Sequence, residues 1–183
     1  MYSLRRGLLL CHRNPNLWSN GIRAFSTSDP SSLRRSVASL LDSLSLKQGQ
    51  TLVQNCGDSD IGKLVVELAK ERKLQTISII EDKPGTPEII EELKALGGDI
   101  VVPESYTKTW YMKRLVSEMS PSAGINFGDG YQATAVGKAV VDGGTLVSYK
   151  KKLPKHVVYD GAARKEIEWD AFTKEKKLKV LNV

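Results

Sequence analysis

The stretch Thr51-Leu-Val-Gln-Asn-Cys-Gly-Asp-Ser-Asp-Ile-Gly62 decides the fold. It contains an apolar strand, a turn with a glycine, and the start of a helix that we expect to run from Ile61 to Lys73. In parallel α/β folds this order points the unpaired N–H groups and the positive dipole end of the helix at the phosphates of a dinucleotide. The turn carries two carboxylates, Asp58 and Asp60. The order of elements therefore favours a dinucleotide-binding fold, whereas the charges disfavour phosphate binding.

Apolar runs alternate with amphipathic segments along most of the chain. Leucine and valine recur at helical spacing after Ser31 and Ser32, which predicts a leading helix over residues 33–46. Beyond it we expect strands at 51–55, 75–81, 99–102, 124–127, 144–149 and 177–183, and helices at 61–73, 87–96, 108–119, 131–141 and 165–173. Strands with little polar alternation, separated by helices, are typical of a parallel sheet covered on both faces. We predict an α/β fold, a doubly wound (Rossmann-like) parallel sheet of about six strands in a single domain.

Residues 1–28 have the composition of a mitochondrial leader. They contain four arginines, several serines and leucines, and no acidic residue. The apolar run from Gly7 to Cys11 is too short to cross a bilayer. We expect a transit peptide over 1–28, the Rossmann-like domain with its leading helix over 29–183, and a protein of the mitochondrial matrix without a transmembrane segment. A disordered basic tail is the alternative interpretation of 1–28.

The net charge of +6 comes mostly from this leader. Removing its four arginines from the 27 basic residues leaves 23 against 21 acidic ones, a net charge of +2. This balance gives no electrostatic reason to expect a nucleic-acid partner. Cys56 is the only cysteine beyond the leader, and His12 and His156 lie far apart in the sequence. These counts predict neither an internal disulfide nor a metal site.

Several short segments resemble one known family. They are Gln54-Asn55, Leu93-Lys-Ala-Leu-Gly97, Ile125-Asn-Phe-Gly128 and Gly143-Gly-Thr-Leu-Val-Ser-Tyr149, in this order along the chain. Together they resemble the cofactor domain of mitochondrial 2-enoyl thioester (trans-2-enoyl-CoA) reductases, in the zinc-free branch of the medium-chain dehydrogenase/reductase superfamily. The resemblance begins near Leu33 and continues to the end of the chain. It implies a site for NAD or NADP at the carboxyl edge of the sheet.

The resemblance assigns cofactor contacts to a set of loop residues: Gly57, Ser59, Ile61, Gly62, Glu81, Lys83 and Gly128. Asp60, however, stands where the family has a glycine, and a carboxylate about 5 Å from a phosphate costs about 3 kcal/mol. Lysines at 150–152 also replace family glycines. We therefore interpret these residues as a relic site and expect no bound cofactor. Helix capping is the alternative role for Asp58, Ser59 and Asp60.

Glu81 bears on the choice between the two dinucleotides. It follows Gly62 by 19 residues, a spacing at which an acid hydrogen-bonds the ribose 2′-hydroxyl. The family instead carries an arginine-rich segment there for the 2′-phosphate of NADPH. If the site still binds a dinucleotide, we expect a preference for NAD, with Lys83 as a candidate phosphate contact. Lys63 either contacts a phosphate, neutralises one of the acids or is a solvated surface lysine. A plain surface acid at a strand end is the alternative role of Glu81.

Two functions are compatible with these features. In the family, an N-terminal domain supplies a catalytic tyrosine, and a segment beyond the sixth strand completes the substrate cleft. Because this sequence has only a leader and one helix before the sheet and stops at Val183, we assign no catalytic residue. Our first hypothesis is a non-catalytic accessory subunit of a large mitochondrial assembly (a respiratory complex, the ATP synthase or the mitoribosome), joined to other subunits through the edge strand 177–183.

The second hypothesis is an NAD(P)-dependent enoyl thioester reductase of mitochondrial fatty acid synthesis whose missing parts come from another chain. Binding of a dinucleotide separates the two hypotheses, since only the enzyme requires it. In the superfamily the corresponding edge strand pairs across a dimer, so a homodimer through residues 177–183 is compatible with both.

Overall fold

The computed structural model describes residues 30–149, 153–159 and 165–183, so the predicted leader and residues 150–152 lie outside it. Its strands are β1 (Thr51–Gln54), β2 (Gln75–Ile80), β3 (Ile100–Pro103), β4 (Ala123–Asn126), β5 (Thr145–Ser148), β6 (His156–Tyr159), β7 (Lys165–Glu168) and β8 (Lys179–Asn182). Its helices are α1 (Pro30–Ser43), α2 (Asp60–Glu71), α3 (Thr86–Leu96), the 3-10 turn η1 (Glu104–Lys108), α4 (Trp110–Met119), α5 (Tyr131–Ala139) and α6 (Trp169–Glu175).

Six of the strands form one parallel sheet in the order β3-β2-β1-β4-β5-β8. The chain moves outward from β1 through β2 to β3, then returns to place β4 on the other side of β1. The direction of winding therefore reverses between β1 and β4, and ligands of doubly wound folds bind outside the strand ends at such a point. The predicted fold class, a Rossmann-like parallel sheet of six strands, is confirmed.

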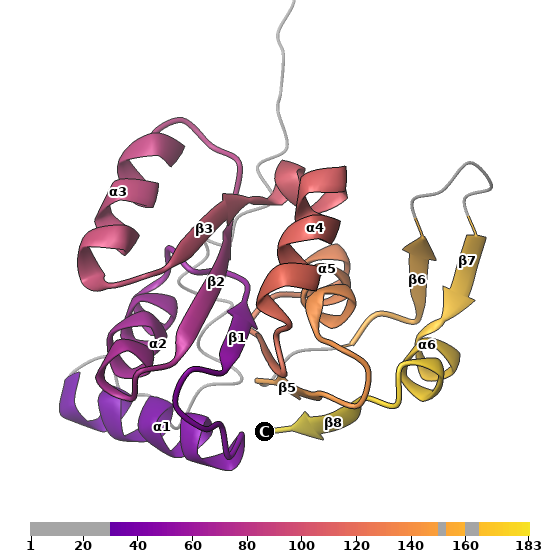
Figure 1. Ribbon diagram of the computed structural model, residues 1–183, viewed down its shortest axis with the longest axis horizontal. Coiled ribbons are helices and arrows are strands. Elements are labelled where there is room, and N and C mark those ends of the chain that lie inside the picture. Colours follow the sequence, from indigo (N-terminus) through magenta and orange to yellow (C-terminus); the bar gives the residue numbers. More distant parts are fainter. Residues whose placement is uncertain (1–29, 150–152, 160–164) are drawn as a thin grey trace, which may run out of the picture.

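Helices cover both faces of this sheet (Figure 1). Neighbouring residues of β1 point to opposite faces of the sheet. Leu52 packs in the cluster formed with α1 and α2, whereas Val53 packs in the cluster formed with α4, α5 and α6. A third cluster joins α2 and α3 to the β2–β3 side of the sheet. Every residue of β1 and β4 is buried, which explains why their sequences lack polar alternation.

The predicted helix over 165–173 is wrong in its first half. Residues 165–168 form β7, which pairs antiparallel with β6, and the helix begins only at Trp169. Ile167 is the only apolar residue of Lys-Glu-Ile-Glu, and it pairs with the buried Val157 on β6. One apolar residue among three charged ones forms no strand pattern, so nothing local separates these residues from the helix that follows. The leading helix also begins earlier than predicted, at Pro30, and ends at Ser43.

Helix α6 connects the hairpin to the main sheet. Its Trp169 and Phe172 are buried against α5, whose Gly137 leaves room for both rings. The ammonium group of Lys176 donates hydrogen bonds to the carbonyl oxygens of Lys138, at 3.0 Å, and Val140. These bonds satisfy carbonyls at the end of α5 that the helix leaves without partners.

Candidate functional site

The glycine turn after β1 holds the start of α2 close to the strand end. Ser59 caps the helix, because its Oγ accepts a hydrogen bond from the backbone N–H of Gly62 at 3.2 Å. A Cβ atom at Gly62 would lie 2.8 Å from the Cα of Gly57 and closer still to the carbonyl oxygen of Cys56. Both neighbours are backbone atoms, so they cannot move aside as a side chain does. Glycine at position 62 is therefore required for this packing.

The first turn of α2 offers free backbone donors. Within the described residues, no oxygen accepts a hydrogen bond from the N–H of Asp60 or Ile61. Such donors, together with the positive end of the helix dipole, bind anions in other proteins. The exposed carboxylate of Asp60 lies on the same turn and opposes a negatively charged ligand.

Asp58 does not cap the helix. Its carboxylate is 6% exposed and forms an ion pair with the Nζ of Lys83, which lies in the loop between β2 and α3. The predicted site residue Lys83 is thus brought to the glycine turn, where it compensates the charge of Asp58. Lys63 instead forms an ion pair with Glu92 of α3, in which its Nζ lies 2.6 Å from Oε1 of the glutamate. Of the three proposed capping residues, only Ser59 accepts a hydrogen bond from the helix start.

A buried polar network ties together the ends of β1, β4 and β5. The Nδ2 of Asn55 donates to the Oδ1 of Asn126 at 2.6 Å, and the Nδ2 of Asn126 donates to the Oγ of Ser148 at 3.1 Å. The backbone N–H groups of Phe127 and Gly128 donate to the Oδ1 atoms of Asn55 and Asn126. The network therefore fixes the strand ends on both sides of the switch point.

Gln132 is a residue of the edge that the sequence analysis missed. It lies in the first turn of α5, and a Cβ at Gly128 would lie 2.9 Å from the Cβ of Gln132, so the glycine makes room for this side chain. The Sγ of Cys56 lies 3.9 Å from the Oε1 of Gln132, and Gln132 also hydrogen-bonds the carboxyl of Glu104. Gln132 therefore links the ends of β1 and β3 across the edge. An ordinary glutamine in a helix carries no motif that predicts such a contact.

Acidic residues follow both β2 and β3. Ile80, the last residue of β2, pairs with Pro103, the last residue of β3, so the next residues, Glu81 and Glu104, leave the sheet at neighbouring positions. Burial raises the pKa of Glu104 above its usual value, and the negative charge of Glu81 raises it further. The sheet edge beyond these two strands is therefore negative.

Asp82 adds a third carboxylate to this edge. Its two oxygens accept hydrogen bonds of 2.7 Å from the backbone N–H and the hydroxyl of Ser105, which holds η1 against the β2–α3 loop. Its charge also contributes to the raised pKa of Glu104, whereas the ammonium of Lys108 acts in the opposite direction. The predicted site residue Glu81 thus stands in a group of three acids, a grouping that only the pairing of β2 with β3 produces.

Replacing Glu104 by glutamine is expected to stabilise the protein at pH 7 by up to about 1 kcal/mol, a small effect because Glu104 is partly exposed. Since its pKa is raised in the folded state, the folded protein holds this proton more tightly, and wild-type stability falls as the pH rises through that pKa. The gain from Glu104→Gln should therefore be present at pH 7 and absent below the ordinary carboxyl pKa. Urea unfolding at both pH values measures it, with the exposed Glu175→Gln as control. An equal gain at both pH values would contradict the assignment.

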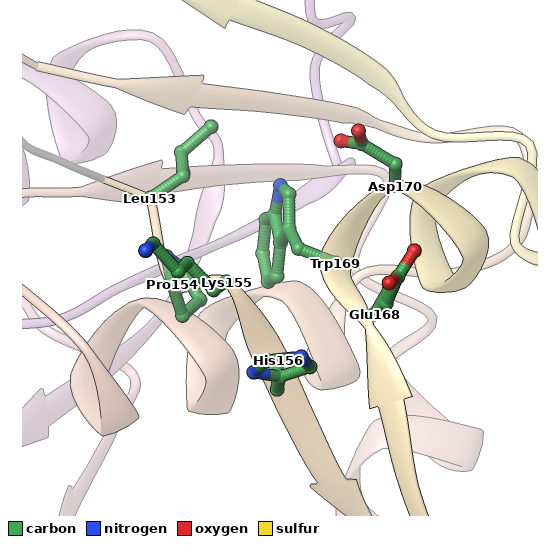
Figure 2. Close-up of a pocket in the computed structure, with 7 residues that line it drawn as sticks. All are labelled: Leu153, Pro154, Lys155, His156, Glu168, Trp169 and Asp170. Carbon is green, nitrogen blue, oxygen red and sulfur yellow. The ribbon is translucent and has the colours of Figure 1, made fainter.

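A pocket lies at the β6–β7 hairpin, away from the sheet edge described above (Figure 2). It has a volume of about 520 Å³ and is lined by Leu153, Pro154, Lys155, His156, Glu168, Trp169 and Asp170. The Nδ1 of His156 lies 3.5 Å from an oxygen of Glu166 across the hairpin. None of the predicted site residues lines this pocket. The described residues contain no group of three or more His, Cys, Asp or Glu side chains placed to hold a metal ion.

A parallel sheet with a tight glycine turn, a helix that starts directly after it and a switch point beside them defines a class of fold, the Rossmann-like doubly wound domain. The chain is 40% identical over 111 residues to the mitochondrial enoyl-[acyl-carrier-protein] reductase of Dictyostelium discoideum, and 39% and 30% identical to those of Arabidopsis thaliana and Homo sapiens. These matches span 60% of this chain but only 30–32% of each relative. No family model matches the chain.

Solved structures give the same result for the fold. A mitochondrial 2-enoyl thioester reductase heterodimer from Candida tropicalis superposes with a TM-score of 0.67 at 19% identity, over 82% of this chain and 41% of that one. A complex of such a reductase with NADP and crotonyl-CoA superposes with a TM-score of 0.67 at 18% identity. This match covers 87% of this chain and 44% of that one. The predicted resemblance to this family and the mitochondrial location are confirmed by these relatives. No helix among the described residues is long and apolar enough to cross a membrane.

Proposed function

We propose that this chain supplies the dinucleotide-binding part of a mitochondrial oxidoreductase of the enoyl thioester reductase type. The observation that carries the proposal is the glycine turn, in which Gly62 packs on the backbone and the N–H groups of Asp60 and Ile61 have no acceptor among the described residues. The sequence similarity to enoyl-[acyl-carrier-protein] reductases over the same region supports it.

The residues of the turn fit a nicotinamide dinucleotide at most contacts. Gly57 and Gly62 keep the turn tight, because a Cβ at either position would collide with Ser78 or with the backbone of Cys56 and Gly57. The N–H groups of Asp60 and Ile61 would then bind the pyrophosphate oxygens, and Glu81 would accept from a ribose hydroxyl. When bound, reduced nicotinamide supplies the hydride that reduces a 2-enoyl double bond. The side chains of this chain bind and orient it, and the asparagine network keeps the strand ends in place around it.

The charge of the turn is less unfavourable than the sequence suggests. Asp58 is neutralised by Lys83, so of the two turn carboxylates Asp60 is the one with no ion-pair partner among the described residues. Asp60 is exposed, and solvent screens its repulsion. The resulting penalty weakens binding without closing the site.

Replacing Asp60 by glycine is expected to tighten dinucleotide binding by about tenfold to a hundredfold, because it removes a carboxylate from the phosphate subsite. Isothermal titration calorimetry with NADH on the full chain measures the change. Asp60→Asn is the matched control, since it removes the charge but keeps a side chain. Equal affinities for wild type and Asp60→Gly would contradict the position assigned to the pyrophosphate.

The test of the proposed function is direct titration of the purified chain with NADH and NADPH. Binding with a micromolar Kd supports a working cofactor domain. Reduction of crotonyl-CoA by the assembly isolated from mitochondria then tests the reaction. No binding at millimolar dinucleotide by the wild type would overturn the proposed function.

A non-catalytic accessory subunit is the second candidate, and the observation that favours it is Asp60 itself. Strand β8 ends the sheet order and has no strand on its outer side among the described residues. A free strand edge of this kind binds another polypeptide, either a different subunit or a second copy of this chain. Recovery of binding in Asp60→Gly, with none in the wild type, would favour this candidate, as would migration of the chain in a particle much larger than 20.2 kDa.

A further inference from the structure

The acidic group at the ends of β2 and β3 has a consequence for cofactor choice. In doubly wound folds the adenosine ribose lies at the end of the second strand, and an acid there hydrogen-bonds the 2′-hydroxyl. Glu81 is the residue directly after β2, and it is partly buried. Glu104 leaves the sheet next to Glu81, because Ile80 pairs with Pro103, and Asp82 is hydrogen-bonded to Ser105, the residue after Glu104. The charges of Glu81 and Asp82 both act on Glu104.

The cations near this position are already engaged. Lys83 forms the ion pair with Asp58, and Lys108 lies 4.8 Å above the ring of Tyr131. A 2′-phosphate would bring about two negative charges to three carboxylates, whereas a 2′-hydroxyl brings a hydrogen-bond donor and no charge. The two dinucleotides differ only in this group.

We propose that Glu81, with Asp82 and Glu104 beside it, makes the site select NAD(H) and reject NADP(H). This inference rests on the proposed function, because it concerns the same site. It assigns to Glu81 the role of specificity-determining residue, and to Asp82 and Glu104 the role of maintaining a negative field around it.

Calorimetric titration of the full chain with NADH and with NADPH tests this selection without any measurement of activity. If wild-type affinity is too weak to compare, the same pair of titrations is made in the Asp60→Gly background. The expected result is binding of NADH at least about tenfold tighter than NADPH, from repulsion between the phosphate and the carboxylates. Equal affinities, or tighter binding of NADPH, would overturn the inference and leave the proposed function in place.

The Glu81→Gln variant then assigns the selection to one residue. It should bring the ratio of the two Kd values to within about threefold, by weakening NADH and strengthening NADPH. Glu175→Gln on α6 is the charge-matched control and should leave the ratio unchanged. A ratio that stays at the wild-type value in Glu81→Gln, in a protein with an unchanged circular dichroism spectrum, would overturn the role of Glu81. Absence of binding by the wild type at millimolar dinucleotide would overturn the proposed function, and absence in the Asp60→Gly background as well would overturn the inference with it.

Discussion

Replacing Asn126 by alanine is expected to lower the free energy of unfolding by about 3 kcal/mol or more. Asn126 is 0% exposed, and its Oδ1 accepts from both the Nδ2 of Asn55 and the backbone N–H of Gly128. Alanine leaves these two donors and the hydroxyl of Ser148 buried without this partner. A buried donor that loses its acceptor costs about 1–3 kcal/mol.

Urea unfolding followed by circular dichroism measures this loss. Asn182→Ala is the matched control, because Asn182 is an exposed asparagine at the end of β8 and should change stability by less than about 0.5 kcal/mol. Asn126→Ala should also weaken any dinucleotide binding, since the ends of β1 and β4 lose their connection. A variant as stable as wild type would show that the network does not hold the strand ends.

Replacing Gly62 by alanine is the second substitution with a large expected effect. It should lower the free energy of unfolding by about 3 kcal/mol. Helix propensity alone predicts the opposite sign, since alanine stabilises a helix by up to about 1 kcal/mol relative to glycine. At Gly62, however, the added Cβ would collide with the backbone of Cys56 and Gly57. The turn and the helix would have to separate, which also moves the N–H groups of Asp60 and Ile61.

The comparison with Gly137→Ala makes this result interpretable. Gly137 lies within α5, and a Cβ there would lie 3.1 Å from a ring atom of Trp169 and 3.3 Å from one of Phe172. Those neighbours are side chains that can shift by a few tenths of an ångström. Gly137→Ala should therefore lower the free energy of unfolding clearly less than Gly62→Ala does. Equal stability changes at the two glycines, measured by thermal unfolding, would contradict the backbone collision at Gly62.

Part of this architecture follows from local patterns. The order of apolar strands and amphipathic helices predicts the parallel sheet, because residues of β1 and β4 are buried on both faces and need no polar alternation. The β6–β7 hairpin does not follow in the same way. Residues 165–168 contain a single apolar residue and carry no strand pattern of their own, and only the pairing of Ile167 with Val157 makes them a strand.

The candidate site likewise contains residues whose roles follow from local sequence and residues whose roles depend on tertiary contacts. Ser59 and Gly62 are predictable, because capping and close packing act between residues a few positions apart. The roles of Asp58 and Glu81 are not predictable in this way. Asp58 has its charge compensated by a lysine 25 residues away, and Glu81 becomes one of three acids because β2 pairs with β3.

The amino-acid sequence by itself determined the fold class, the family resemblance and the position of the glycine turn, since these depend on periodicity and on short-range geometry. The tertiary structure alone decided which charges at the turn are compensated and which remain. Electrostatic interactions depend on distances in space, and those distances are set by strand pairing and loop packing between segments far apart in the chain.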